Sequence, residues 1–345
     1  MTGENGVLVV SLLLPVGFGV ALVVFFRSRE AGGSDRRGLL LGNALVLGLL
    51  LSLCLAGGEL YFRFVYDTTE SFGFSKVGRR WYERYFHKNA AGYRDGIDYP
   101  MAVRPGTRRI SFLGDSFTTG QGLPDIAERF VNRVRAARPE WEVHAIADNG
   151  WNTGVEIEEI ETITEQGYEL DRVVLVYCLN DGADLVPDWQ RTVRSLVVDR
   201  RESWWVANSY LINTLYYRLM ASRDPRVAGY YTKMLDGYEA AVWQAQLRRL
   251  EGLARDVRKR GGELEVVTFP FLNLMGEDPY PFSEVHDQLD ELWGRLNVRH
   301  LDLRDLYAGL DPDELVVNPF DAHPNAHAHE LAAGAILRFL DNPGG

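Results

Sequence analysis

Residues 108–116 read RRISFLGDS, and this stretch decides the class of fold that the sequence specifies. Residues 108–114 form a short apolar run that ends in glycine, a pattern typical of a buried strand in a parallel sheet. Apolar residues at helical spacing follow at 124–138, and Pro124 stands near the start of that segment, where proline suits a helix. The change of period predicts a strand, a turn and a helix in succession.

The same alternation continues toward the C-terminus. We expect further strands at 141–147, 171–181, 263–271 and 298–303, and helices at 154–167, 235–260, 283–297 and 329–340. Strands that alternate with helices predict an α/β fold, in which an open sheet of about five parallel strands lies between two helical layers. Residues 183–234 are rich in Trp and Tyr and do not fit this alternation. We expect them to form a helical insertion between the third and fourth strands.

The first sixty residues contain two long uncharged runs, at 5–26 and 38–58. A bilayer core requires about 20 apolar residues in a helix, and both runs meet that length. We therefore expect a two-helix transmembrane hairpin with helices at about 6–27 and 38–60. The alternatives are a signal peptide and a buried helical hairpin. A signal peptide begins with a positive stretch, whereas Glu4 stands here, and neither run shows the polar face of a buried hairpin.

Arginine counts predict how this hairpin is oriented. The segment between the two runs holds Arg27, Arg29, Arg36 and Arg37, whereas the residues before the first run contain no Lys or Arg. Because segments rich in Lys and Arg stay in the cytoplasm, we expect a cell-membrane protein whose remaining residues are extracytoplasmic, either periplasmic or extracellular.

Residues 61–106 are rich in aromatic side chains, and we expect a connector that packs on a domain formed by residues 107–345.

Composition excludes some functions. The formal net charge is −11 and the pI is near 5.2. Nucleic acid is therefore not an expected partner, because proteins that bind it carry a basic excess.

The two cysteines, Cys54 and Cys178, lie in an apolar run and in an expected buried strand, respectively. We expect no disulfide between them.

Reactive side chains follow four of the expected strands. In open parallel sheets, ligands bind beyond the carboxyl ends of the strands, so loops that follow the strands meet at one edge. The residues at this edge are Asp115 and Ser116 after the first strand, Gly150 and Asn152 after the second, Asn180 and Asp181 after the third, and Asp321 and His323 after the fifth.

These residue types suit nucleophilic catalysis. A serine hydroxyl needs a base to take its proton, and His323 can do so if Asp321 fixes its tautomer. The oxyanion of a tetrahedral intermediate needs hydrogen-bond donors, which the Ser116 and Gly150 backbone N–H groups and the Asn180 amide can supply. For Asp115 and Asp181 we expect hydrogen bonds to loop backbone. Taken alone, Ser116 is equally compatible with a helix N-cap.

Four short blocks resemble those of SGNH (GDSL-type) hydrolases, in the same order and with similar spacing. The blocks read GDSFTTGQG (114–122), NGWNT (149–153), CLND (178–181) and DAHPN (321–325), and the resemblance covers about residues 85–341. The segment HKNAAGYRD (87–95) is similar to one found before the first block in bacterial members. Cys178 and Ala328 stand where the family often has glycine.

This resemblance implies a flavodoxin-like fold and the hydrolysis of acyl esters, commonly acetyl or other acyl groups on carbohydrates or lipids. Ser116 matches the nucleophile, Gly150 and Asn180 match the oxyanion donors, and Asp321 and His323 match the rest of the triad. Asp115, Asp181 and Asn152 are expected to support the site.

We therefore expect a membrane-anchored serine esterase that needs neither cofactor nor metal. A metal site at Asp321, His323, His327 and His329 is the weaker interpretation, since His327 and His329 do not share a helix face. One alternative is an O-acyltransferase that modifies an envelope polysaccharide. Another is a non-catalytic carbohydrate-binding protein on the same fold.

Overall fold

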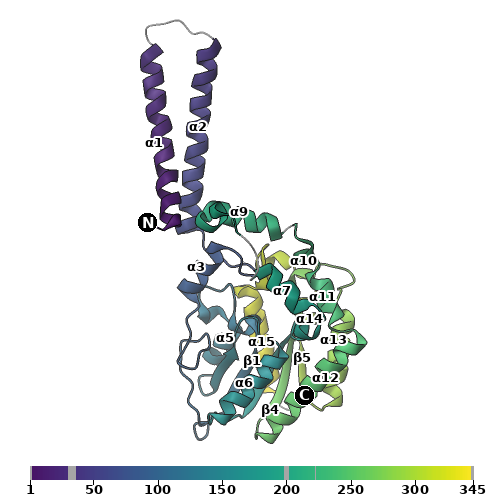
Figure 1. Cartoon of the computed structure of the whole chain (residues 1–345). Coiled ribbons are helices and arrows are strands. Elements are labelled where there is room, and N and C mark those ends of the chain that lie inside the picture. The colour runs from purple at the N-terminus through teal and green to yellow at the C-terminus, as the bar shows by residue number, and fades with distance from the viewer. Residues whose placement is uncertain (1, 30–35, 198–201, 222, 343–345) are drawn as a thin grey trace. The chain divides into compact units, whose positions relative to one another are not determined.

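The computed structural model describes residues 2–29, 36–197, 202–221 and 223–342, and the chain divides into two compact units (Figure 1). The first unit comprises Met1–Thr68, Gly73–Arg80 and Arg200–Arg223. The second comprises Thr69–Phe72, Trp81–Asp199 and Asp224–Gly345. The expected connector (61–106) and the expected insertion (183–234) each contribute residues to both units.

The second unit is built on a five-stranded parallel sheet. Its strands are β1 (Arg109–Gly114), β2 (Glu142–Ala147), β3 (Arg172–Cys178), β4 (Glu263–Phe269) and β5 (Arg299–Asp302). Their spatial order is β2-β1-β3-β4-β5, and every neighbouring pair is parallel. This is the flavodoxin-like strand order, and it confirms the expected α/β fold.

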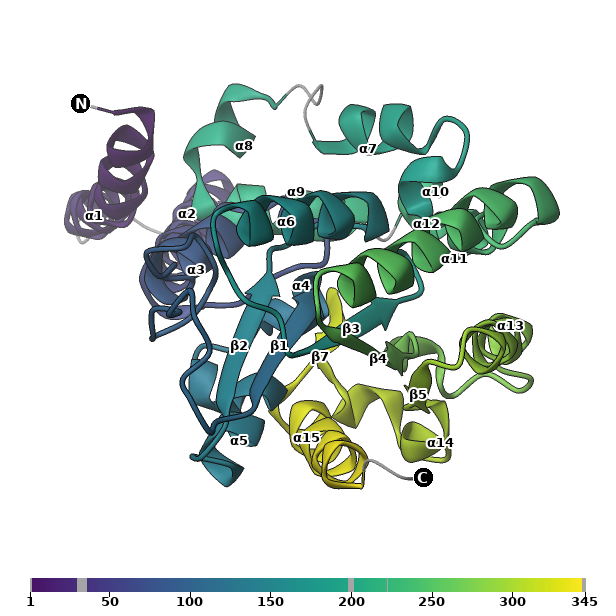
Figure 2. The ribbon, with the colours of Figure 1, turned by 90° about the horizontal axis from the view of Figure 1, so that it is seen from below.

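Helices cover both faces of this sheet (Figure 2). Helices α5 (Phe130–Ala137) and α15 (Ala326–Asp341) lie on one face, and α6 (Thr153–Glu165) and α12 (Ala240–Lys259) lie on the other. Helix α13 (Ser283–Arg295) packs on β5. Because the sheet is covered on both sides, every residue of β1, β2 and β3 is buried. The three-layer architecture is therefore confirmed.

The helix expected at 235–260 begins only at Ala240, because Glu239 before it has an extended backbone. Two other local structures differ from the sequence expectations. The helix expected at 124–138 is divided into a 3₁₀ turn, η2 (Ile126–Glu128), and helix α5, because Arg129 between them has an extended backbone. The segment with Asp321 and His323, expected to be a loop, is an antiparallel ribbon of β6 (Val316–Asn318) and β7 (Asp321–Pro324). Apolar periodicity does not detect either feature, because one extended residue or a four-residue strand is too short to establish a period.

Short helices join these elements. They are α4 (Ser116–Thr119), η3 (Ala183–Leu185), α7 (Trp189–Val197), α10 (Pro225–Ala228), α11 (Tyr230–Asp236), η4 (Leu272–Leu274), α14 (Arg304–Tyr307) and η5 (Pro312–Glu314). Helix α3 (Lys76–Tyr85) begins in the first unit and ends in the second.

The first unit contains two long apolar helices that pack side by side (Figure 1). They are α1 (Gly3–Arg29) and α2 (Arg36–Leu60), which continues into the π-helical turn η1 (Tyr61–Val65). The most apolar windows have mean hydropathies of 2.8 and 2.4, so both helices are long and apolar enough to cross a membrane. Residues 30–35, most of the expected cytoplasmic loop, lie outside the described residues.

The first unit also includes two shorter helices, α8 (Trp204–Asn208) and α9 (Tyr210–Ala221). Cys54 on α2 and Cys178 on β3 are both free, as expected.

Candidate active site

Ser116 lies at the carboxyl end of β1, where the chain turns into helix α4. The Asp115 side chain caps this helix, since its Oδ1 accepts a hydrogen bond from the Phe117 N–H at 2.9 Å. A Cβ added to Gly114 would lie 2.4 Å from Thr118 Oγ1 and 3.0 Å from the Val176 carbonyl oxygen. The Gly-Asp-Ser sequence therefore meets local needs: glycine allows close packing and aspartate holds the turn that presents Ser116.

The structure brings Ser116, His323 and Asp321 together. The His323 Nε2 atom lies 2.8 Å from Ser116 Oγ, and the opposite ring nitrogen, Nδ1, contacts Asp321 Oδ1. Asp321 is fully buried, whereas Ser116 and His323 keep 7% and 9% exposure. The Asp321 carboxylate also accepts a hydrogen bond from the His323 backbone N–H at 3.2 Å. This geometry favours one tautomer of the neutral ring, in which the Nδ1–H group donates to Asp321 and Nε2 accepts a hydrogen bond from the Ser116 hydroxyl.

The electrostatics of this trio favour a protonated imidazole. Burial opposes the charge on His323, but the Asp321 carboxylate outweighs it, so the pKa of His323 lies above its ordinary value of 6.5. Burial likewise opposes ionisation of Asp321, and His323 reverses this effect, so that the pKa of Asp321 is lowered. Asp115 also raises the pKa of His323. The ring is therefore a stronger base than a solvated histidine.

The expected oxyanion donors follow the two strands that flank β1. Gly150 follows β2 and Asn180 follows β3, and the order β2-β1-β3 places the Ser116 turn between these two loops. Gly150 has φ of +77°, a backbone region that favours glycine, and it is exposed. Asn180 adjoins the nucleophile turn, since its side chain lowers the pKa of Asp115. The three loops meet at the sheet edge that the sequence indicated.

Two of the supporting residues form capping and loop contacts. Asn152 Oδ1 caps helix α6 by accepting from the Gly154 N–H at 2.9 Å. Asp181 Oδ2 accepts from the Cys178 N–H at 2.9 Å, and the backbone carbonyl of Asp181 accepts from the Thr153 N–H. Both contacts shape the loops that carry the candidate oxyanion donors.

Residues 69–72 support the ribbon that holds His323, and sequence reasoning did not identify them. The Ser71 N–H donates to the Phe320 carbonyl at 3.0 Å, and Ser71 Oγ accepts from the Ala322 N–H at 2.9 Å. Asn318 Nδ2 donates to the Thr69 carbonyl at 3.2 Å. These bonds involve mainly backbone groups, which leave no sequence motif.

A second missed group fixes the loop before Gly150. Asn149 Oδ1 accepts from Thr119 Oγ1 at 2.5 Å. Its Nδ2 donates to Tyr82 Oη at 3.0 Å and to Gln121 Oε1 at 2.8 Å. Thr119 and Gln121 belong to the block GDSFTTGQG, so the polar residues that follow Ser116 in this block were the available signal.

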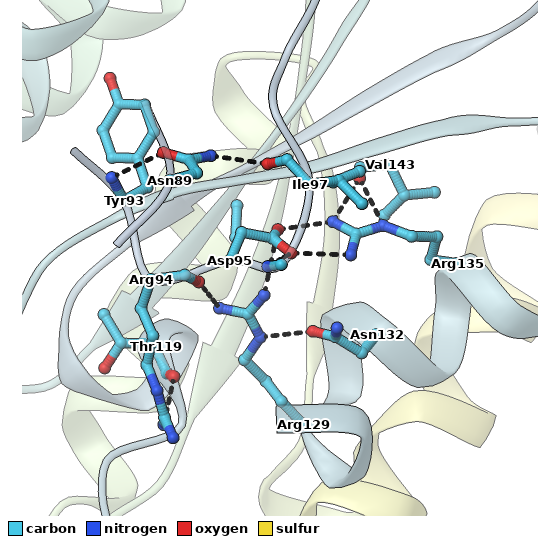
Figure 3. A network of polar contacts seen from close by, with 12 residues as sticks. Asn89, Tyr93, Arg94, Asp95, Ile97, Thr119, Arg129, Asn132, Arg135 and Val143 are labelled. Atoms are coloured by element: carbon cyan, nitrogen blue, oxygen red, sulfur yellow. Dashed lines mark hydrogen bonds and ion pairs between the residues drawn. The ribbon is translucent and has the colours of Figure 1, made fainter. Parts of the chain in front are cut away.

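Arg94 supports the far end of the nucleophile helix (Figure 3). Its guanidinium is buried and donates to the carbonyls of Thr119 at 3.1 Å, Gly120 at 2.6 Å and Leu123 at 2.6 Å. Burial, reinforced by the charge of Arg129, lowers the pKa of Arg94 to about 9, so it remains charged at neutral pH. Arg94 thus satisfies carbonyl groups that end helix α4.

Asp95 links this segment to helix α5 (Figure 3). Its carboxylate accepts from Arg135 at 2.9 and 2.6 Å and from Arg129 at 3.3 Å. Arg129 in turn donates to the Arg94 carbonyl at 2.8 Å. The Arg94–Asp95 pair within HKNAAGYRD therefore belongs to a buried polar network that joins this segment to the end of helix α4 and to helix α5.

The alternative metal site is not supported by the histidine environments. His329 is buried, stacks on Phe130 and accepts from the Phe130 N–H through Nδ1 at 3.3 Å. Burial and the nearby Arg129 charge lower its pKa to about 3, so it is a neutral core residue. His327 is exposed. Within the described ranges, no cluster of three or more His, Cys, Asp or Glu side chains is arranged to hold a metal ion.

Comparisons with known proteins find similarity at the level of solved structures. No protein-family model matches the sequence, and no curated protein matches it. The chain is similar to a lipase/acylhydrolase from Enterococcus faecalis (17% identity, 68% of this chain, 96% of that chain, TM-score 0.40). It is also similar to a G-D-S-L family lipolytic protein from Veillonella parvula (15% identity, 68% of this chain, 97% of that chain, TM-score 0.42). A third similar structure is a catalytic mutant of an acetylxylan esterase from Geobacillus stearothermophilus (14% identity, 69% of this chain, 96% of that chain, TM-score 0.42).

Replacing Arg94 should destabilise the second unit. We expect Arg94→Met to lower the free energy of unfolding by roughly 3 kcal/mol, because buried carbonyls that lose a partner cost about 1–3 kcal/mol each. The control is Arg138→Met, which removes an ion pair with Asp341 that lies at the surface and should have little effect. Denaturant unfolding of the full chain in detergent measures both. Equal losses in the two variants would contradict a special role for Arg94.

Removing the Asp321 charge should lower the pKa of His323. In Asp321→Asn the carboxylate that outweighs burial is absent, so the pKa should fall below the ordinary 6.5. Proton NMR titration of the histidine ring resonances measures this pKa. Asp290→Asn is the matched control, since Asp290 pairs with another histidine, His300, and its loss should leave His323 unchanged. An unchanged His323 pKa in Asp321→Asn would show that another group sets it.

Proposed function

We propose that the second unit is a serine ester hydrolase that uses Ser116, His323 and Asp321. The observation that carries this proposal is the continuous contact from Ser116 Oγ to His323 Nε2 at 2.8 Å and from His323 Nδ1 to Asp321. A hydroxyl, an imidazole and a carboxylate in this order form the arrangement that activates serine for acyl transfer. The exposures of Ser116 and His323 leave part of both groups accessible to a substrate.

The reaction follows from this geometry in two halves. Ser116 Oγ attacks the ester carbonyl carbon while His323 Nε2 takes the hydroxyl proton. When the tetrahedral intermediate collapses, the bond to the alkoxy oxygen breaks, and His323 gives its proton to the departing alcohol. Water then attacks the acyl-enzyme with His323 again as base, which releases a carboxylic acid and restores Ser116. Asp321 orients the ring and stabilises its charged form in both halves.

The oxyanion of each intermediate needs donors near the Ser116 turn. We assign this role to the backbone N–H groups of Ser116 and Gly150 and to the Asn180 side chain. The order of the strands supports this assignment, because β1 lies between the strands that precede Gly150 and Asn180. The positive φ of Gly150 also supports it, since a side chain there would strain the backbone. The substrate is an acyl ester of a small molecule, a carbohydrate or a lipid.

We further propose that α1 and α2 anchor the chain in a membrane, with the second unit outside the cytoplasm. The length and hydropathy of both helices support the anchor. The four arginines near the junction between them support the orientation, because such segments remain in the cytoplasm.

Loss of the Ser116 hydroxyl should abolish ester hydrolysis. We expect Ser116→Ala to reduce p-nitrophenyl acetate turnover by about 10³-fold or more, and to lose labelling by a fluorophosphonate probe. Ser283→Ala is the control, because Ser283 Oγ contacts only a backbone carbonyl of its own turn in the described hydrogen bonds. Undiminished turnover in Ser116→Ala would remove Ser116 from the mechanism. A wild-type chain that neither reacts with the probe nor hydrolyses any ester would indicate a binding protein.

Activity should fall at acidic pH with a midpoint above 6.5. His323 acts as a base only when neutral, and its pKa is raised, so kcat/KM should decline as pH falls through that pKa. Stability should respond in the opposite sense, since a raised folded-state pKa contributes stability at low pH that is lost as pH rises through it. A pH profile of kcat/KM, with unfolding measured at each pH, tests both. An acid midpoint below 6.5 would contradict the assignment of His323 as the base.

A further inference from the structure

Helix α9 in the first unit has its polar side chains inside and its apolar side chains outside. Asn213 and Thr214 are fully buried, and Tyr217 is 2% exposed. The exposed residues recur at the i, i+3, i+4, i+7 spacing of one helix face. They are Ile212, Leu215, Tyr216 and Leu219. A helix on the surface of a water-soluble domain has the opposite distribution.

Hydrogen bonds determine which face of α9 points inward. Asn213 Oδ1 accepts from the Lys76 N–H at 2.8 Å, and Asn213 Nδ2 donates to the Val206 carbonyl at 3.0 Å. Thr214 Oγ1 donates to the Tyr210 carbonyl at 2.8 Å. Rotating the helix to bury its apolar face would break the two Asn213 bonds. The outward apolar stripe is therefore a fixed feature of this unit.

Neighbouring elements of the same unit extend this apolar surface. Trp204 and Trp205 of α8 are 54% and 57% exposed, and their rings contact each other edge to face. Turn η1, on which α9 packs, exposes Tyr61, Phe64 and Val65. We call the surface formed by these five residues and the α9 stripe the apolar collar. Its aromatic residues are Trp204, Trp205, Tyr61, Phe64 and Tyr216.

The apolar collar lies at one end of the helical hairpin (Figure 1). Glu59, in the last turn of α2, is buried and accepts from Ser209 Oγ at 2.7 Å and from the Tyr210 and Leu211 N–H groups at 3.1 Å each. Its carboxylate thus binds the first turn of α9, where helix N–H groups lack partners. The first turn of α1 is at the same end, since Arg63 donates to the Glu4 carbonyl at 2.9 Å.

We propose that the apolar collar binds the interfacial region of the phospholipid bilayer that α1 and α2 cross. The inference rests on the proposed membrane anchoring. Tryptophan and tyrosine concentrate where a bilayer meets water, and the collar places them at the end of two helices of membrane-spanning length. Helix α9 lies at the end of the hairpin and runs transverse to α1 and α2 instead of continuing along them, which suits a helix that lies in the plane of the interface (Figure 1).

The tryptophans allow a direct test in the full chain. Of the eight tryptophans in the sequence, only Trp204 and Trp205 fall within the first unit. The chain is reconstituted into phosphatidylcholine vesicles whose acyl chains carry bromine near the carboxyl end or near the methyl end, or carry none. We expect shallow bromine to quench emission more than deep bromine.

Two variants identify the quenched residues. The double variant Trp204→Phe, Trp205→Phe should lose the bromine-dependent quenching, while Trp141→Phe should keep it. Trp141 is a matched control because its ring lies in the second unit, against Arg108 and Arg138. Thermal unfolding verifies that each variant is folded.

Flotation separates failure of the collar from failure of the anchor. A chain that does not float with the vesicles contradicts the proposed anchoring. A chain that floats, but whose emission does not change with bromine, contradicts the proposal for the apolar collar and leaves the proposed anchoring unaffected. Emission that ignores bromine but changes with the number of chains per vesicle shows that a second copy covers the collar, and this also overturns the proposal. Quenching retained by the double variant overturns it as well.

Discussion

The contact between His323 and Ser116 is the constraint on which the candidate site depends, because it joins residues 207 positions apart in the sequence. It forms only if two conditions are met. The carboxyl end of β1 must lie at the edge of the sheet where the loops meet, and the β6–β7 ribbon must be held at that same edge. The parallel sheet supplies the first condition, since all its strands point to one edge. Residues 69–72 supply the second, because their hydrogen bonds hold both sides of the turn at Phe320. Secondary structure alone thus does not place His323, and a segment outside the sheet completes its position.

The sequence was sufficient to predict the fold, and it indicated the sheet edge at which Ser116, His323 and Asp321 lie in contact. Each polar block follows a strand, and the geometry of a parallel sheet brings such positions together without any knowledge of side-chain contacts. The sequence was not sufficient for the groups that hold the site. Ser71 acts through one hydroxyl and its backbone, and Arg129 interrupts a helix by adopting an extended conformation. Neither has a periodic signature. Arg94 lies in the segment HKNAAGYRD, but its role depends on buried carbonyl partners that the sequence does not indicate.

Three buried acidic groups, Asp115, Glu156 and Asp181, interact near the Ser116 turn, and Asp115 adds to the effect of Asp321 on His323. Burial raises the pKa of Asp115 to about 6. Burial, together with repulsion from Asp115, raises the pKa values of Glu156 and Asp181 well above their ordinary values. Three carboxyl groups in one desolvated region cannot all ionise at low cost. Negative charge that remains on Asp115 raises the pKa of His323 further. This arrangement makes the ring a better proton acceptor, and it also keeps the ring protonated over a wider pH range, in which it cannot act as a base.

In the first unit, the burial of polar side chains leaves the apolar face of helix α9 exposed, whereas such a face usually packs against a protein core. From sequence alone, the spacing of Ile212, Leu215, Tyr216 and Leu219 predicts a helix face directed toward a protein core. The structure directs Asn213 and Thr214 inward instead, because buried polar groups need partners and Asn213 finds them in Lys76 and Val206. An apolar face is favourable outside only where water is replaced by another medium. The same argument applies to Glu59, whose charge is tolerated beside an apolar helix because three donors from the start of α9 surround it. In this unit, the hydrogen bonds of the polar interior determine which face of α9 is exposed.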